Sequence, residues 1–183
     1  MLTLYRQALD ELGHVLDKLD DPAVDDAVAA IASARRVVVF GGGREGLQIR
    51  GFAMRLFHLG QDVSVVGDMT TPAIGGGDLF LVVCGPGEIS TAMALVGVAK
   101  AAGATVLVIT AQPDGRVPRM ANSVLVLPAQ TMADDQGPDA SLLPMGSVFE
   151  GALFVLFEVM VLKLKAALDV SSETMRQNHT NLE

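Results

Sequence analysis

The feature that most constrains the fold is an apolar run that leads directly into a glycine loop, and the chain contains this unit twice. The first apolar run, at 37–40, is followed by three glycines at 41–43, and the second, at 79–83, is followed by Cys-Gly-Pro-Gly at 84–87. A strand, a tight turn and a helix start together aim free N–H groups and the positive end of a helix dipole at one point, which suits an anion such as phosphate. The two units therefore predict a ligand site beside both loops.

Strand-like and helix-like segments alternate through the middle of the chain. Short β-branched or apolar runs, typical of strands buried on both faces, occur at 37–40, 63–66, 79–83, 105–110 and 124–127. Helical stretches at 47–59 and 91–102 lie between some of these runs. The alternation predicts an α/β fold, with a parallel sheet of about five strands covered by helices on both sides.

The length and composition favour a single domain with a full core. The chain has 183 residues, of which 50% are hydrophobic. We expect a helical extension at 1–34, the main sheet core at 35–128, a loop at 129–145 and C-terminal helices at 146–183. The loop is assigned from its content of Asp, Gln, Gly and Pro.

Charge and cysteine content exclude several classes of partner. The net charge of −8 argues against nucleic acid and anionic membrane surfaces as general partners. The apolar stretch at 148–168 contains Glu150, Glu158, Lys163 and Lys165, so we expect a buried helix there and no membrane span. Only one cysteine is present, which excludes an intrachain disulfide and favours a reducing compartment, and we expect a cytoplasmic protein.

One alternative is a dinucleotide-binding protein. Gly41, Gly43 and Gly46 match the pattern Gly-x-Gly-x-x-Gly, and Asp68 follows the next apolar run at about the distance at which dinucleotide folds bind the adenine ribose. The pattern alone is weak, because glycine-rich loops after strands occur in several unrelated phosphate-binding folds. The chain also lacks a second region large enough for a separate catalytic domain.

Residues 37–183 resemble the sugar isomerase (SIS) domain family, and within it the 6-phospho-3-hexuloisomerases. The similar stretches lie at 41–44, 52–60, 65–68 with 71–74, 144–150 and 179–183. The resemblance implies a doubly wound, flavodoxin-like sheet of five parallel strands with N-terminal helices, and assembly into dimers or tetramers. It also implies a phosphosugar site at the sheet edge, and an aldose–ketose type of interconversion of D-arabino-hex-3-ulose 6-phosphate to fructose 6-phosphate through a cis-enediol. Such chemistry needs a base and an oxyanion donor but no metal or redox cofactor.

The resemblance also assigns candidate catalytic residues. Glu150 follows a Pro-Met-Gly-Ser turn, begins the long C-terminal helix and matches the family position of the catalytic base. His58 and His179 are candidates for proton transfer or ring opening, because histidine can donate or accept a proton near neutral pH. Both match positions near subunit contacts of the family, so a neighbouring chain is a possible source of the working histidine. Arg44 in the first loop is a candidate ligand of the phosphate or of a sugar hydroxyl.

The phosphate-binding loops depart from the family pattern. Glu45 stands where the family has a serine, and the family's Ser-Gly-Ser-Gly-Glu-Thr is replaced by Cys-Gly-Pro-Gly-Glu-Ile at 84–89. Hydroxyl donors are lost, Pro86 removes a backbone donor, and we expect Glu45 to repel a phosphate. Ser90 and Thr91 could compensate if the following helix starts later. The expected substrate-binding residues are Gly43, Arg44, Glu45, Asp68, Cys84, Gly85, Gly87, Glu88, Ser90, Thr91, Met145, Gly146 and Ser147.

These departures keep a second alternative open beside the dinucleotide binder. The leading hypothesis is a sugar-phosphate isomerase of the hexuloisomerase type. The alternative is a non-catalytic SIS module that binds a sugar derivative. Retention of Glu150, His58 and His179 favours the enzyme, whereas the altered loops favour a sensor or a changed substrate.

Overall fold

The computed structural model describes residues 3–138 and 140–182, and its centre is a five-stranded sheet in which every neighbouring pair is parallel. The strand order is β2-β1-β3-β4-β5, which is the doubly wound, flavodoxin-like order. This confirms the fold expected from the sequence. The strands are β1 (Val37–Gly41), β2 (Val63–Val65), β3 (Leu79–Val83), β4 (Thr105–Thr110) and β5 (Ser123–Val126).

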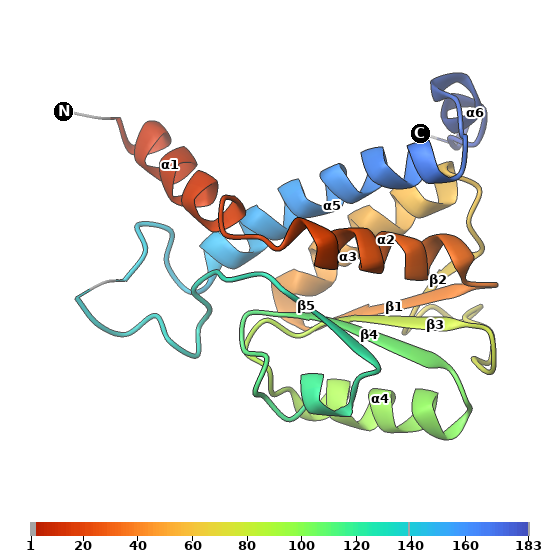
Figure 1. Ribbon diagram of the computed structural model, residues 1–183, viewed down its shortest axis with the longest axis horizontal. Coiled ribbons are helices and arrows are strands. Elements are labelled where there is room, and N and C mark those ends of the chain that lie inside the picture. Colours follow the sequence, from red (N-terminus) through yellow and green to blue (C-terminus); the bar gives the residue numbers. More distant parts are fainter. Residues whose placement is uncertain (1–2, 139, 183) are drawn as a thin grey trace.

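Helices cover both faces of the sheet (Figure 1). One face carries α2, α3 and α5, and the other carries α4. At the N-terminal end, α1 extends away from the sheet and packs against α5. The helices are α1 (Leu4–Leu16), α2 (Asp21–Ser33), α3 (Gly43–His58), α4 (Ser90–Ala101), α5 (Ser147–Ala167) and α6 (Ser172–Gln177), with a short 3-10 helix at Pro118–Met120.

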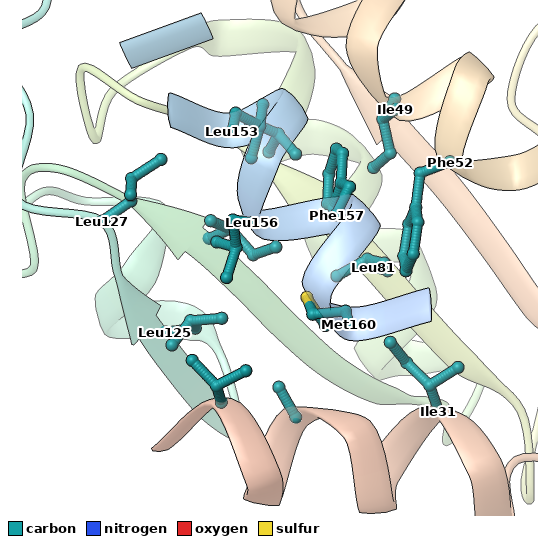
Figure 2. Packing of buried hydrophobic residues seen from close by; sticks show 14 of the residues in the cluster. Ile31, Ile49, Phe52, Leu81, Leu125, Leu127, Leu153, Leu156, Phe157 and Met160 are labelled. Atoms are coloured by element: carbon teal, nitrogen blue, oxygen red, sulfur yellow. The ribbon is translucent and has the colours of Figure 1, made fainter. Parts of the chain in front are cut away.

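Two hydrophobic clusters, one on each face, hold the layers together. The larger cluster joins α2, α3 and α5 to the sheet, and Figure 2 shows Phe157 of α5 beside Phe52 of α3, whose rings stack at 4.3 Å. The smaller cluster packs α4 against the opposite face through residues such as Val96 and Val108. Because β3 is buried on both faces, its five residues are all apolar. The edge strand β2 is only half-buried.

The structure changes one boundary that matters for the site. The sequence predicts that the helix after the first glycine loop begins at Leu47, but α3 begins at Gly43. Gly42 is the residue before the helix, and Arg44 and Glu45 lie in its first turn rather than in a loop. The apolar periodicity that locates a helix starts only where side chains face the core, so it missed this polar first turn.

Close packing of two glycines explains why the helix can start so early. A Cβ on Gly46 would lie 2.7 Å from the carbonyl oxygen of Gly41, and a Cβ on Gly41 would lie 2.9 Å from the backbone of Glu45 and Gly46. The end of β1 and the first turn of α3 are therefore in direct backbone contact. Two members of the Gly-x-Gly-x-x-Gly pattern thus serve this contact.

The long apolar helix α5 is largely buried, as expected. Among residues 3–138 and 140–182, no helix is long and apolar enough to cross a bilayer.

Replacing Gly46 with alanine should destabilise the protein by about 1–3 kcal/mol, the usual cost of overpacking. The added methyl group would overlap the Gly41 carbonyl oxygen, so β1 and α3 would have to separate. Urea unfolding measures the change. Gly97→Ala in α4 is the matched control, since its Cβ would have no neighbour within 4 Å, and it should stabilise the protein by about 0.5–1 kcal/mol. Equal unfolding midpoints for Gly46→Ala and the unchanged protein would contradict the role of this contact.

Candidate active site

A cavity of about 400 Å³ lies at the carboxyl edge of the sheet, where the chain leaves β1 and β3. β2 lies on one side of β1, and β3 lies on the other side, so the direction in which strands are added to the sheet reverses at β1. Doubly wound folds bind ligands at such a switch point, at the carboxyl ends of the strands. The walls come from the first turn of α3, the loop after β3, the loop before α5 and the first turn of α5. The lining residues are Gly42, Gly43, Arg44, Glu45, Pro86, Ile89, Thr131, Met132, Met145, Gly146, Phe149 and Glu150.

An ion pair between Arg44 and Glu150 lies in this cavity and joins the first turns of α3 and α5. The Arg44 Nη2 is 2.9 Å from the Glu150 Oε2. The Glu150 side chain is 15% exposed, which is enough for contact with a ligand in the cavity. Burial raises the pKa of Glu150, and the Arg44 charge opposes that rise. Glu150 is therefore a partly desolvated carboxyl group whose ionised form is stabilised by its partner.

The turn before α5 brings three further predicted residues to the same place. Met145 and Gly146 both have left-handed backbones, with φ of 58° and 77°. This turn directs the Met145 carbonyl and the Ser147 hydroxyl toward Arg44, which donates hydrogen bonds to both; the Arg44 Nη1 to Ser147 Oγ distance is 2.9 Å. A left-handed backbone is uncommon for a residue other than glycine, so Met145 adopts a conformation that the surrounding contacts must maintain.

Glu45 occupies a different position from the one that the sequence suggested. Its side chain is buried, with 7% exposure, and its Oε1 accepts a hydrogen bond of 2.9 Å from the Gly85 N–H of the second loop. The carboxyl group thus takes a backbone donor that an anion could otherwise use. Burial raises the pKa of Glu45 to about 7, and the nearby Glu150 charge also raises it. Near neutral pH both the protonated and the ionised form of Glu45 are therefore accessible.

Most of the remaining predicted residues of the second loop face away from the cavity. Cys84 is fully buried in the α4-side cluster, where burial raises the pKa of its thiol to about 12. Gly87 packs against Gly115 of the loop after β4. Glu88 forms a 2.9 Å ion pair with Arg116 at the surface. The cavity is instead lined on this side by Pro86 and Ile89.

Ser90 and Thr91 are exposed in the first turn of α4. The helix starts at Ser90, one residue before the predicted start, so the later start that would let them compensate for the lost hydroxyls does not occur. Asp68 is exposed at the surface and pairs with Arg50 at 3.3 Å. None of these three side chains belongs to the cavity as the described residues form it.

His58 and His179 meet each other, but at the opposite end of α3. Their rings stack with centroids 5.0 Å apart. Asn178 donates a 3.0 Å hydrogen bond from its side chain to the His58 carbonyl, which holds the end of the chain against α3. Arg44 and His58 are at the two ends of α3, about 20 Å apart at the rise of an α-helix. The histidines therefore line a second hollow, of about 600 Å³, and not the cavity of Glu150 in the same chain.

Sequence reasoning missed half of the lining. Gly42, Pro86 and Ile89 were visible in the glycine units but were not assigned to the site. Thr131 and Met132 belong to the irregular segment between β5 and α5, where no periodic pattern places a residue. Phe149, one residue before Glu150, cannot be distinguished in the sequence from the other apolar residues of this buried helix.

The cavity residues provide one cation, two carboxyl groups, a buried threonine and several apolar walls. Within the described part of the chain, no group of three or more His, Cys, Asp or Glu residues is placed to hold a metal ion. The arrangement can accept an anionic or hydroxylated ligand at Arg44 and can move a proton at Glu150.

Comparison with known proteins agrees with this architecture. The SIS domain family model matches residues 30–155. A protein from Mycobacterium gastri named 3-hexulose-6-phosphate isomerase is 39% identical over 174 residues, which cover 95% of this chain and 87% of that protein. A protein of the same name from Methylomonas aminofaciens is 34% identical over 175 residues, and the match covers 96% of each chain.

A solved structure shows that the fold is shared over nearly the whole chain. A Methanococcus jannaschii protein, for which a molecular function of 3-hexulose-6-phosphate isomerase was inferred, superposes with a TM-score of 0.85 at 24% identity, covering 98% of both chains. At that identity the likeness concerns the fold alone. Because the family model matches more than half of the chain and the relatives match it nearly end to end, this protein belongs to the SIS domain family, among relatives named 3-hexulose-6-phosphate isomerase.

Proposed function

We propose that this protein is an isomerase that converts D-arabino-hex-3-ulose 6-phosphate to fructose 6-phosphate. The observation that carries the proposal is the Glu150 carboxyl group, which is partly buried at the switch-point cavity and paired with Arg44 at 2.9 Å. The names of the relatives from Mycobacterium gastri and Methylomonas aminofaciens support the same reaction. The enzyme acts on a small-molecule sugar phosphate.

In this reaction the carbonyl group moves from C3 to C2. Glu150 in its ionised form removes the proton from C2, and the electrons of that C–H bond form a C2–C3 double bond as the C3 carbonyl becomes a hydroxyl. The resulting cis-enediol is the common intermediate. Glu150 then returns a proton to C3 while the C2 hydroxyl loses its own proton and becomes the new carbonyl. The C3 oxygen takes up one proton from the solvent when the enediol forms, and the C2 hydroxyl releases one when it collapses, so the atoms balance without any external reductant or oxidant.

Arg44 has two tasks in this proposal. Its positive charge favours the ionised form of Glu150, because it opposes the rise in the pKa that burial causes. Its guanidinium group also provides N–H donors for the oxygen on which negative charge develops as the enediol forms. Hydrogen bonds to Ser147 and Met145 hold the guanidinium in place.

The working enzyme is a homo-oligomer, a dimer or a tetramer, in which a second copy supplies the histidines. Within one chain His58 and His179 are about 20 Å from Arg44, too far to act at Glu150. Exposed apolar side chains lie on the helices that carry both sets of residues, which supports a contact between copies. They are Leu47, Met54 and Phe57 of α3, and Phe154 and Leu162 of α5.

We also propose that the enzyme works in the cytoplasm. Its one cysteine, Cys84, is a free and buried thiol, as suits a protein of a reducing compartment.

The binding module without catalysis remains the second candidate. The observation that favours it is the hydrogen bond from Gly85 to Glu45, which occupies a donor of the second loop. Turnover by the purified protein decides between the two.

Glu150→Gln should abolish conversion of the hexulose phosphate, with kcat reduced by about 10³-fold or more, because the amide cannot accept the C2 proton. Substrate affinity should change little. A coupled assay for fructose 6-phosphate measures kcat and KM. Asp25→Asn, which removes a carboxyl group that pairs with Lys163 of α5 on the outer side, is the control and should keep full activity. Full activity in Glu150→Gln would remove Glu150 from the role of base.

Arg44→Gln should move the acid limb of the kcat/KM profile to higher pH. Loss of the arginine removes the charge that opposes the rise in the pKa of Glu150, so the base becomes protonated at a higher pH. Activity relative to the unchanged enzyme should thus fall more at pH 6 than at pH 8. Arg50→Gln changes another arginine of α3, paired with Asp68, and should leave the limb in place. An unshifted limb in Arg44→Gln would contradict the coupling to Glu150.

Two inactive variants should restore each other if the site is shared between copies. When Glu150→Gln and His179→Asn chains are refolded together in equal amounts, about a quarter of the sites combine an intact Glu150 with an intact His179 of another copy, given random and symmetric assembly. About a quarter of full activity should return. Mixing Glu150→Gln with the double variant Glu150→Gln/His179→Asn is the control and should return none. No recovery in the first mixture would show that each chain works alone.

A further inference from the structure

Glu45 is the buried carboxyl group that the proposed reaction leaves without a role. It lines the cavity and is 7% exposed, and its Oε1 accepts a hydrogen bond of 2.9 Å from the Gly85 N–H. Its Oε2 is equally enclosed and has no hydrogen-bond partner within the described residues. Burial of an ionised carboxylate with one oxygen unpaired is unfavourable. Such a group is expected either to bind a ligand through that oxygen or to carry a proton there.

The charges around Glu45 do not favour its ionised form. Glu150 faces it from α5 and repels it. Arg44, its neighbour on α3, is engaged with Glu150. Cys84 at the end of β3 is a neutral thiol, because burial and the Glu45 charge raise its pKa to about 12. Among the described residues of these elements, none therefore offers an unpaired positive charge beside Glu45.

The loop before α5 adds no positive charge either. It contributes Thr131 and Met132 to the cavity. It also places Asp134 beside them, whose Oδ1 accepts hydrogen bonds from the Thr131 N–H and hydroxyl. With Glu45 ionised, the cavity lining holds two carboxylates and one guanidinium.

A sugar phosphate would bring close to two further negative charges into this cavity. Repulsion between a phosphate dianion and an adjacent carboxylate is strong where water is excluded. Because burial raises the pKa of Glu45 to about 7, protonation of this group near neutral pH has a small free-energy cost. The protonated carboxyl group also becomes a donor, and the enclosed Oε2 is the oxygen free to carry the proton.

We propose that Glu45 is a substrate-binding residue that acts in its protonated form, donating a hydrogen bond from Oε2 to the phosphorylated substrate while Oε1 keeps the Gly85 N–H. One proton therefore enters the site with each substrate molecule when Glu45 starts ionised. This inference rests on the proposed function, since it takes a sugar phosphate as the ligand. The expected effect of Glu45 on the phosphorylated substrate is then an affinity that depends on pH, in place of a repulsion at every pH.

Calorimetric titration of fructose 6-phosphate over about pH 6 to about pH 8.5 tests the proposal. For the unchanged protein the dissociation constant should rise above about pH 7, approaching tenfold per pH unit, because the proton must be taken up from solution. Above about pH 7 the phosphate itself is almost entirely a dianion, since its second pKa is about 6. In Glu45→Gln the constant should be flat above about pH 7, since a neutral amide needs no proton. At about pH 8.5, about 1.5 units above the pKa of Glu45, this variant should bind about 30-fold more tightly than the unchanged protein.

Titration at about pH 7 in two buffers of different ionisation heat counts the proton directly, and the unchanged protein should take up about half a proton more than Glu45→Gln. Asp114→Asn, which removes an exposed carboxyl group from the loop after β4, is the matched control and should keep the original profile. Glu45→Ser provides a second neutral variant if the glutamine variant does not fold, and it should also give a flat profile.

The outcomes separate this inference from the proposed function. If both neutral variants keep the pH dependence of the unchanged protein, Glu45 is not the group that takes up the proton and the inference is overturned. Absence of fructose 6-phosphate binding at about pH 6 also overturns it. If the protein converts the substrate but replacement of Glu45 leaves the pH dependence of substrate binding unchanged, this inference alone is contradicted. Binding with the expected profile but without conversion contradicts the isomerase and leaves the role of Glu45 supported.

Discussion

The contact between the first turns of α3 and α5 is the interaction on which the candidate site depends. Arg44 at the start of α3 reaches Glu150, Ser147 and the Met145 carbonyl at the start of α5. The two helices begin at the same edge of the sheet because α3 follows β1 without a spacer, which is possible only through the backbone contact of Gly41 with Gly46. The position of the Arg44–Glu150 ion pair thus rests on a contact that only glycine permits.

The surroundings of the two cavity carboxyl groups suit the different roles that we propose for them, a base and a group that carries a proton. Burial raises the pKa of both Glu45 and Glu150, but only Glu150 has a cation beside it. The two carboxyl groups therefore differ in how readily they ionise, as an acid and base pair must. The Gly85 N–H also lowers the pKa of Glu45, but burial outweighs it. This division of roles comes from the surroundings, because the side chains are chemically identical.

The two histidines lie at the opposite end of α3 from the cavity that contains Glu150. His58 ends α3, and His179 follows α6, so their position is set by the length of α3 and by the return of the chain after α5. The apolar residues left exposed on α3 and α5 lie between these two ends along the helices. A symmetric contact through this surface would bring the histidine end of one copy toward the glutamate end of another.

The sequence by itself determined the sheet and most of its strands, because the signal for a buried parallel strand is local and every residue of β3 carries it. It also predicted a ligand site beside the two glycine loops, and Glu150 and Arg44, the candidates that family likeness suggested, line a cavity there. Only the tertiary structure decided that Glu45 bonds to Gly85, a partner 40 positions away, and that the segment at 129–145 closes one wall. Those contacts join segments that share no periodicity in the sequence. The pKa of Glu45 is raised by burial, and burial exists only once the helices have packed on the sheet.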